Sequence, residues 1–360
     1  MSNYIISKYD PGLLISTGIL ILIGLVVLAS SAQEFFVRQL IWLIPSILMI
    51  LGIPLTNPKS LFSYKWAIYG GYFAILGLLV ITYFVAPSIG GARAWIPLGA
   101  FQIQASEFMK AALIILLSSF FASQHVAIAR LGIIFRSFVY MIIPSVLVLI
   151  QPDLGTVLVL FGIWFSYLLL SGLKLKHLTA AMLILVVIAA VGWNFLLFDY
   201  QKARISALFN PEADPLGINY NVIQSKIAIG SGGFWGKGFG QGTQAHLGFL
   251  PASHTDFAFS SFVEEWGLFG GLIVIATFIY LIYRIMILGI ESENNFSKFM
   301  ALGTALMISI HFVINLGSAT GLLPVIGVGL PLVSYGGSNL LTVALLLGII
   351  QGVCDTRNRI

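Results

Sequence analysis

The stretch "GLLISTGILILIGLVVLASSA", residues 12 to 32, decides the fold class because it carries no charged side chain over the length of a membrane-spanning helix. It is too long for the apolar part of a cleaved secretory signal, and many similar runs follow it. We therefore interpret it as the first span of a membrane protein.

The whole chain repeats this composition. Its 360 residues are 59% hydrophobic and only 9% charged, and its mean hydropathy is +1.00, which excludes an ordinary soluble domain. Apolar runs predict spans at 12–32, 37–55, 66–86, 106–123, 133–150, 154–171, 178–198, 258–283, 299–318 and 339–353. The predicted fold is all-α: a polytopic membrane protein with ten transmembrane helices, in which residues 1–360 form a single integral membrane domain.

Basic residues set the orientation, because short cytoplasmic loops carry most lysines and arginines. With a cytoplasmic N-terminus, 11 of the 18 lysines and arginines fall in cytoplasmic segments. Outside one long loop, the other face holds only Arg38, Arg93 and Lys110. We therefore predict that both termini are cytoplasmic and that the net charge of +5 reflects topology rather than nucleic acid binding. Several acids then lie at or beyond the outer ends of spans: Glu34, Glu107, Asp153, Asp199, Glu212, Asp214 and Asp256.

Two segments lie between predicted spans without looking like linkers. Residues 199–257 form a large extracytoplasmic loop between the seventh and eighth spans, and its part 220–230 suits a short interfacial helix. The glycine-rich part 230–242 favours a flexible turn, with a lipid-diphosphate contact through Lys226 or Lys237 as the alternative. Residues 319–338 are apolar but interrupted by proline and glycine, which predicts a re-entrant or cavity-lining segment.

Common catalytic frameworks are missing from the sequence. Cys354 is the one cysteine, which excludes a disulfide framework and a multi-thiolate metal site. The five histidines are scattered, so no zinc-type constellation forms, and neither a P-loop nor a GxSxG pattern occurs.

The ionisable residues near the outer ends of spans have two interpretations each. Glu107 and Lys110 are three residues apart on one helix face, so they form either a neutralising ion pair or part of a substrate path, which Arg93 could join. Asp153, in "QPDLGT", either caps the sixth span or contacts substrate. Asp256, beside His254, either caps the eighth span or faces a cavity; His254 is interpreted as a hydrogen-bonding partner rather than a metal ligand.

Five motifs in order resemble the shape, elongation, division and sporulation family of bacterial membrane proteins, over nearly the whole chain. They are "GARAWIPLG" with "FQIQASEFMKAAL" at 91–113, "QPDLGT" at 151–156, "YNVIQSKIAIGSGGFWGKGFGQGTQ" at 220–244, "LPASHTDFAFSSFVEEWGLFG" at 250–270 and "GLPLVSYGGSN" at 329–339. Within the family, "FNPEADPLGINYN" at 209–221 is similar to the RodA-like elongation branch.

The resemblance implies a peptidoglycan glycosyltransferase of the bacterial plasma membrane. Such an enzyme polymerises lipid II on the extracytoplasmic side, releases undecaprenyl diphosphate and works with a class B penicillin-binding protein. The partner's contact is expected around the eighth and ninth spans. In this family the acid that corresponds to Asp256 is essential. The substrate-binding set expected here is Arg93, Glu107, Lys110, Asp153, Lys226, His254 and Ser334.

The chemistry agrees with one catalytic carboxylate. Transfer to a sugar hydroxyl needs a base, for which we predict Asp256, whereas a diphosphate leaving group needs positive charge rather than a proton. Arg93 and Lys110 are predicted to supply that charge, with Glu107 orienting Lys110. Glu107 and Asp153 could also hold a divalent cation, Mg²⁺ or Mn²⁺, through oxygen ligands. A lipid II flippase and a non-catalytic scaffold for the penicillin-binding protein are the alternative functions.

Overall fold

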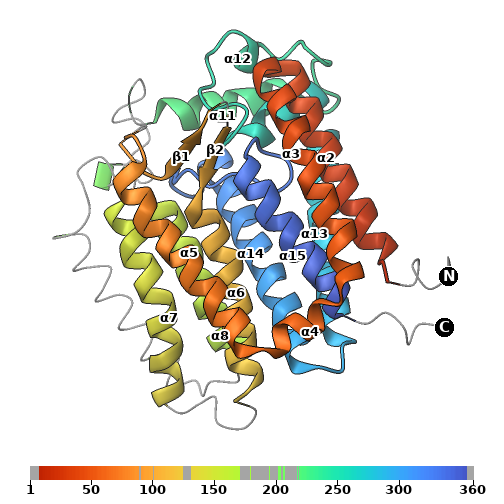
Figure 1. The fold of residues 1–360 in the computed structure, drawn as a ribbon. Helices are drawn as coiled ribbons and strands as arrows, with labels where there is room; N and C mark the ends of the chain where they lie inside the picture. Colours follow the sequence, from red (N-terminus) through yellow and green to blue (C-terminus); the bar gives the residue numbers. More distant parts are fainter. Residues whose placement is uncertain are drawn as a thin grey trace.

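The structure, a computed structural model, describes residues 8–88, 91–99, 101–124, 131–170 and 219–354, with isolated positions between 179 and 217. The long helices of the described part form a bundle (Figure 1): α2 Pro11–Ser31, α3 Gln33–Gly52, α5 Lys65–Val85, α6 Ala105–Ala122, α7 Leu131–Ile150, α8 Leu154–Leu170, α13 Ala258–Ile290, α14 Asn295–Thr320 and α15 Gly337–Val353. The shorter elements are η1 Ile53–Thr56, α4 Pro58–Ser63, β1 Trp95–Leu98, β2 Phe101–Gln104, α11 Tyr220–Ser231 and α12 Thr243–His246.

The helices confirm a polytopic membrane protein. Seven described helices are long and apolar enough to cross a membrane, and α8 and α15 are shorter apolar helices. The predicted span 178–198 and most of the loop 199–219 lie outside the described residues. The count of ten spans and the orientation of the chain therefore remain predictions.

Local signals in the sequence explain where several helices begin and end. Pro11 opens α2, and the carboxylate of Asp10 accepts a hydrogen bond from the N–H of Leu13 at 2.8 Å. Asn294 caps α14 in the same way, and Gly321 ends α14 with a left-handed φ of 75°. These caps satisfy backbone groups that no lipid could bond.

An antiparallel hairpin interrupts the helical bundle. β1 pairs with β2 in a register that sets Trp95 opposite Gln104 and Leu98 opposite Phe101. The hairpin lies with α11 and α12 at one end of the bundle (Figure 1). The all-α prediction was wrong on this point, because two four-residue strands are too short to show a periodic pattern.

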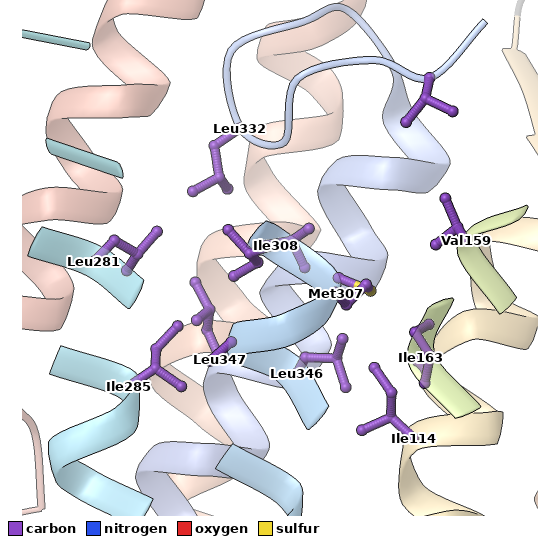
Figure 2. Packing of buried hydrophobic residues seen from close by; sticks show 14 of the residues in the cluster. Ile114, Val159, Ile163, Leu281, Ile285, Met307, Ile308, Leu332, Leu346 and Leu347 are labelled. Carbon is purple, nitrogen blue, oxygen red and sulfur yellow. The ribbon is translucent and has the colours of Figure 1, made fainter. Parts of the chain in front are cut away.

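The core lies where α14 and α15 pass through the middle of the bundle. In Figure 2 their apolar side chains lie between those of α13 on one side and those of α6 and α8 on the other. The labelled side chains of this layer are Met307, Ile308, Leu346 and Leu347 from the two central helices, with Leu281, Ile285, Ile114, Val159 and Ile163 around them. A helix that is apolar on all faces belongs in such a position.

The glycine-rich stretch 230–242 packs against a break in α13. The backbone of α13 is non-helical at Gly267, with φ 70° and ψ −175°. The N–H of Lys237 donates to the carbonyl of Glu264 at 3.0 Å, and its Nζ lies 2.6 Å from the buried Oε1 of the same residue. The stretch is irregular, as predicted, but it is fixed to α13 rather than flexible. The ammonium of Lys237 is paired with Glu264, and its contact with a lipid diphosphate stays a prediction.

Gly267→Ala is expected to lower the stability of the protein by about 1–3 kcal/mol from the backbone alone, because φ 70° with ψ −175° is a conformation adopted almost only by glycine. An added Cβ would also lie 2.3 Å from the backbone N of Gly236 and 2.3 Å from the carbonyl O of Phe234. Gly77→Ala in α5 is the matched control, since its Cβ would meet nothing within 4 Å. Thermal unfolding of both variants in one detergent measures the difference, and equal midpoints would contradict this account of the break.

Candidate active site

The segment that follows α14 is built against the residues that precede α13. Residues 322–336 contain no helix, as predicted for a cavity-lining segment. Tyr335 donates its N–H to the carbonyl of His254 at 2.8 Å, and the hydroxyl of Ser334 donates to the carbonyl of Thr255 at 2.5 Å. The backbone around Asp256 is therefore fixed by a segment that is far away in sequence.

A cavity of about 580 Å³ opens between these two segments, α3, the hairpin and the start of α6. Its wall combines aromatic, amide and charged side chains with several glycines. The lining residues are Phe35, Arg38, Trp42, Trp95, Gly99, Gln102, Gln104, Glu107, His254, Thr255, Asp256, Gly327, Gly329, Ser334, Tyr335, Gly336, Gly337, Ser338 and Asn339. Of the predicted site residues, the structure brings Glu107, His254, Asp256 and Ser334 together here.

Asp256 lies on this wall and is half-buried. The N-cap of α13 is Phe257, whose side chain makes no capping hydrogen bond, so Asp256 does not occupy the cap position predicted for the eighth span. The carbonyl of Asp256 accepts a hydrogen bond from Asn315 Nδ2 at 2.9 Å. The carboxylate therefore stands on a fixed backbone at the edge of the cavity.

His254 forms part of the wall as an uncharged aromatic group. Its ring stacks on Phe35, with 4.3 Å between the ring centroids, and lies 6.2 Å from the ring of Tyr335. Burial lowers the pKa of His254, so the imidazole is neutral near pH 7. A neutral ring in this stack supports the shape of the cavity, and the role of His254 as a hydrogen-bonding partner rather than a metal ligand stays a prediction.

Glu107 and Lys110 form the predicted ion pair, with 2.6 Å between Oε1 and Nζ. The second oxygen of Glu107 accepts a hydrogen bond from Asn339 Nδ2 at 2.9 Å. Lys110 is 1% exposed and lies beneath the wall rather than on it, also 3.1 Å from His311 Nε2. The expectation that Lys110 meets substrate directly is corrected: its side chain contacts Glu107 and His311 and does not line the cavity.

Three other predicted residues lie away from the cavity wall. Asp153 caps α8, accepting from Thr156 N at 3.0 Å and Thr156 Oγ1 at 2.8 Å, which confirms its interpretation as a helix cap. It also accepts from the cavity residue Gln104 at 3.1 Å. Arg93 and Lys226 are exposed, and neither lines the cavity.

Sequence reasoning missed the cation that does line the cavity. Arg38 is the one lysine or arginine among the described lining residues, and its guanidinium lies 5.7 Å from the centre of the Phe35 ring. The sequence marked it only as a charge on the outer face. His311 was also missed, although a polar residue inside a predicted span is itself a signal of function.

The described acids do not form a ready-made metal centre. Among the described residues, no group of three or more His, Cys, Asp or Glu could hold a metal ion. Glu107 has hydrogen-bond donors on both oxygens, and Asp153 is occupied by Thr156 and Gln104. The carboxylate oxygens of Glu107 and Asp153 are therefore already engaged, and the pair does not fit the predicted divalent cation.

A family model described as that of a cell cycle protein, covering FtsW, RodA and SpoVE, matches residues 9–359. The chain belongs to the shape, elongation, division and sporulation family. This confirms the resemblance carried by the five sequence motifs. Three of those motifs, at 91–113, 250–270 and 329–339, contribute residues to the cavity wall.

Named members of the shape, elongation, division and sporulation family are similar to this chain over almost its whole length. Peptidoglycan glycosyltransferase MrdB of Escherichia coli K12 is 38% identical over 346 residues, which is 96% of this chain and 93% of that protein. A chain from a solved peptidoglycan synthase complex that coordinates polymerization and crosslinking superposes with a TM-score of 0.82 at 32% identity, over 98% of this chain and 99% of that one. The structure of the rod shape determining protein RodA of Thermus thermophilus superposes with a TM-score of 0.71 at 28% sequence identity. The match covers 98% of this chain and 97% of that one.

Proposed function

We propose that this protein is a peptidoglycan glycosyltransferase that polymerises lipid II into glycan strands during cell elongation. The observation that carries the proposal is the carboxylate of Asp256 on the wall of a polar and aromatic cavity, where the other carboxylate, Glu107, is paired with Lys110 and the one arginine among the described lining residues is Arg38. The names of the relatives, peptidoglycan glycosyltransferase MrdB and probable peptidoglycan glycosyltransferase FtsW, support it.

The reaction is an inverting transfer. Asp256 removes the proton from the acceptor hydroxyl while that oxygen forms the new bond to the anomeric carbon of the donor sugar. The bond from this carbon to the diphosphate breaks on the opposite side, and undecaprenyl diphosphate leaves with the electron pair. A diphosphate leaving group does not require a proton, so a second carboxylic acid is unnecessary.

Arg38 takes the role that the sequence assigned to Arg93 and Lys110. The departing diphosphate gains negative charge, which a guanidinium can hold through paired hydrogen bonds. Arg38 lies on the wall of the cavity, whereas Arg93 does not line it and Lys110 is buried behind Glu107. Glu107 and Asn339 present polar atoms to the sugars, and Trp42 and Trp95 give apolar surface beside them.

Arg38→Ala is expected to reduce kcat/KM for lipid II by about 10- to 100-fold, the effect of losing one hydrogen bond to a charged group. Arg38→Lys keeps the charge without the paired geometry and should retain part of the activity. Arg93→Ala is the control, because that arginine lies off the cavity wall. Polymerisation of lipid II by the three purified variants tests the assignment, and an equal loss in Arg38→Ala and Arg93→Ala would contradict it.

A class B penicillin-binding protein is the proposed partner, and the described solved synthase complex supports this. Exposed apolar side chains on both sides of the break in α13 could contact such a partner or lipid: Trp266, Leu268, Phe269 and Leu272. We place the protein in the bacterial plasma membrane, with the cavity facing the extracytoplasmic side, where its lipid-linked substrate is polymerised.

Purified protein, with and without the penicillin-binding protein, decides between polymerisation and the alternatives when it is supplied with lipid II. Glycan polymer formed by the wild-type protein is the expected result. Movement of lipid II across vesicles without polymer would favour a flippase, and stimulation of the partner without either activity would favour a scaffold.

A further inference from the structure

We propose that His311 and Asn315, one turn apart on α14, are positioning residues for the transfer reaction. They hold residues 328–330 so that Asp256 and Glu107 keep fixed places on the cavity wall, with Lys110 behind Glu107. This inference rests on the proposed function and assigns to it two side chains that do not line the cavity.

His311 joins the ion pair to the cavity-lining segment. Its Nδ1 lies 3.2 Å from the carbonyl O of Gly329, and its Nε2 lies 3.1 Å from Lys110 Nζ. A carbonyl only accepts, so Nδ1 carries the hydrogen, and Nε2 is then the acceptor for the lysine ammonium. One neutral tautomer therefore satisfies both contacts of a ring that is 1% exposed.

Asn315 joins the same segment to Asp256. Its Nδ2 donates to the carbonyl of Asp256 and to the carbonyl of Val328, each at 2.9 Å. Both partners only accept, which fixes the orientation of the amide. Its Oδ1 is buried without a hydrogen-bond partner in the described part of the chain, a cost in stability that a purely apolar side chain would avoid.

A third link closes the arrangement. Leu330 N donates to Ser334 Oγ at 2.8 Å, and that hydroxyl donates to the carbonyl of Thr255 at 2.5 Å. These hydrogen bonds, together with the backbone of residues 328–330, connect the Glu107–Lys110 pair to the carbonyls of Thr255 and Asp256. Displacing the middle of this set would move the base relative to the acceptor.

Other polar side chains of α14 show that such long-range contacts are not needed to satisfy a polar group in a helix. Thr304 Oγ1 donates to the carbonyl of Met300 at 3.0 Å, and Ser309 Oγ to that of Ala305 at 2.7 Å, both within the helix. His311 and Asn315 instead bond to other elements. Thr304, which is fully buried, therefore provides a matched control.

The test compares kcat and KM for lipid II among folded variants of the full chain with its penicillin-binding partner. Asn315→Leu and His311→Leu are expected to lower kcat by about 10- to 100-fold, because a displacement near 1 Å at a reacting group has effects of that size. KM should change little, since Arg38 and the aromatic wall are untouched. Thr304→Val should match the wild-type protein in both constants.

Conservative variants separate positioning from general support of the fold. His311→Asn can still donate to Gly329, so it should recover part of the kcat lost in His311→Leu, and Asn315→Ser should recover part of that lost in Asn315→Leu. If the leucine variants do not fold, His311→Asn and Asn315→Ser test the inference by themselves. Each is then expected to have a kcat below that of the wild-type protein but still measurable. Folded variants whose kcat equals that of Thr304→Val would overturn the inference, as would a loss confined to KM.

The outcome for Asp256→Asn distinguishes failure of this inference from failure of the proposed function. If Asp256→Asn polymerises lipid II as fast as the wild-type protein, the proposed function on which the inference rests is wrong. An inactive Asp256→Asn variant together with fully active His311 and Asn315 variants leaves the function standing and removes only the positioning role.

Discussion

Asp256→Asn is expected to slow polymerisation of lipid II by at least about 100-fold, the typical contribution of a general base. The amide has the size of the carboxylate but cannot remove a proton from the acceptor hydroxyl. The hydrogen bond from Asn315 goes to the backbone carbonyl of residue 256, so it survives the substitution. The N-cap of α13 is Phe257, so no helix cap is lost.

Asp153→Asn is the matched control for this experiment. It removes a carboxylate of the same type that lies off the cavity wall, and asparagine remains a good helix cap for α8. The account expects polymerisation close to that of the wild-type protein and a similar unfolding midpoint for both variants. An Asp153→Asn variant as inactive as Asp256→Asn would show that loss of either carboxylate acts through the structure and not through proton removal.

Lys110→Met is expected to produce the largest loss of stability, about 3–5 kcal/mol, because it leaves Glu107 as a buried charge without its cation. Lys110 is 1% exposed and Glu107 is 8% exposed, so water cannot replace the lost partner. The double variant Glu107→Gln with Lys110→Met removes both charges and should regain most of the stability. Equilibrium unfolding of Glu107→Gln, Lys110→Met and the double variant in one detergent completes a double-mutant cycle.

Lys226→Met provides the comparison for that cycle, since Lys226 is exposed on α11. Its removal should leave the unfolding free energy nearly unchanged. A Lys110→Met variant no less stable than Lys226→Met would mean that the buried pair does not hold the start of α6. A double variant as unstable as Lys110→Met would mean that packing, rather than charge, explains the loss.

Much of the architecture could be predicted because it depends on local composition. Apolar runs located the described long helices, and the proline and glycine residues of 319–338 indicated irregular backbone. Asp153 was recognisable as a cap from its place ahead of an apolar run, and Asp256 stood out as a charge between apolar segments. In each case the signal lies within a few residues of the feature.

The parts that were missed depend on contacts between distant segments. Arg38 and Arg93 both appear in the sequence as arginines near outer helix ends, and only the packing of α3 beside the hairpin brings Arg38 to the cavity. Lys110 was predicted to contact substrate, but in the structure its ammonium contacts His311 of α14. The break of α13 at Gly267 likewise depends on a stretch that is about 30 residues earlier in the chain.

The most direct test of the central claim, that the carboxylate of Asp256 removes the proton, is the pH dependence of kcat/KM. The wild-type enzyme is predicted to lose activity as the pH falls and the carboxylate becomes protonated, and the residual activity of Asp256→Asn should not show this acid-side loss. The same acid-side loss in both proteins would contradict the claim, because the titrating group would then be another residue.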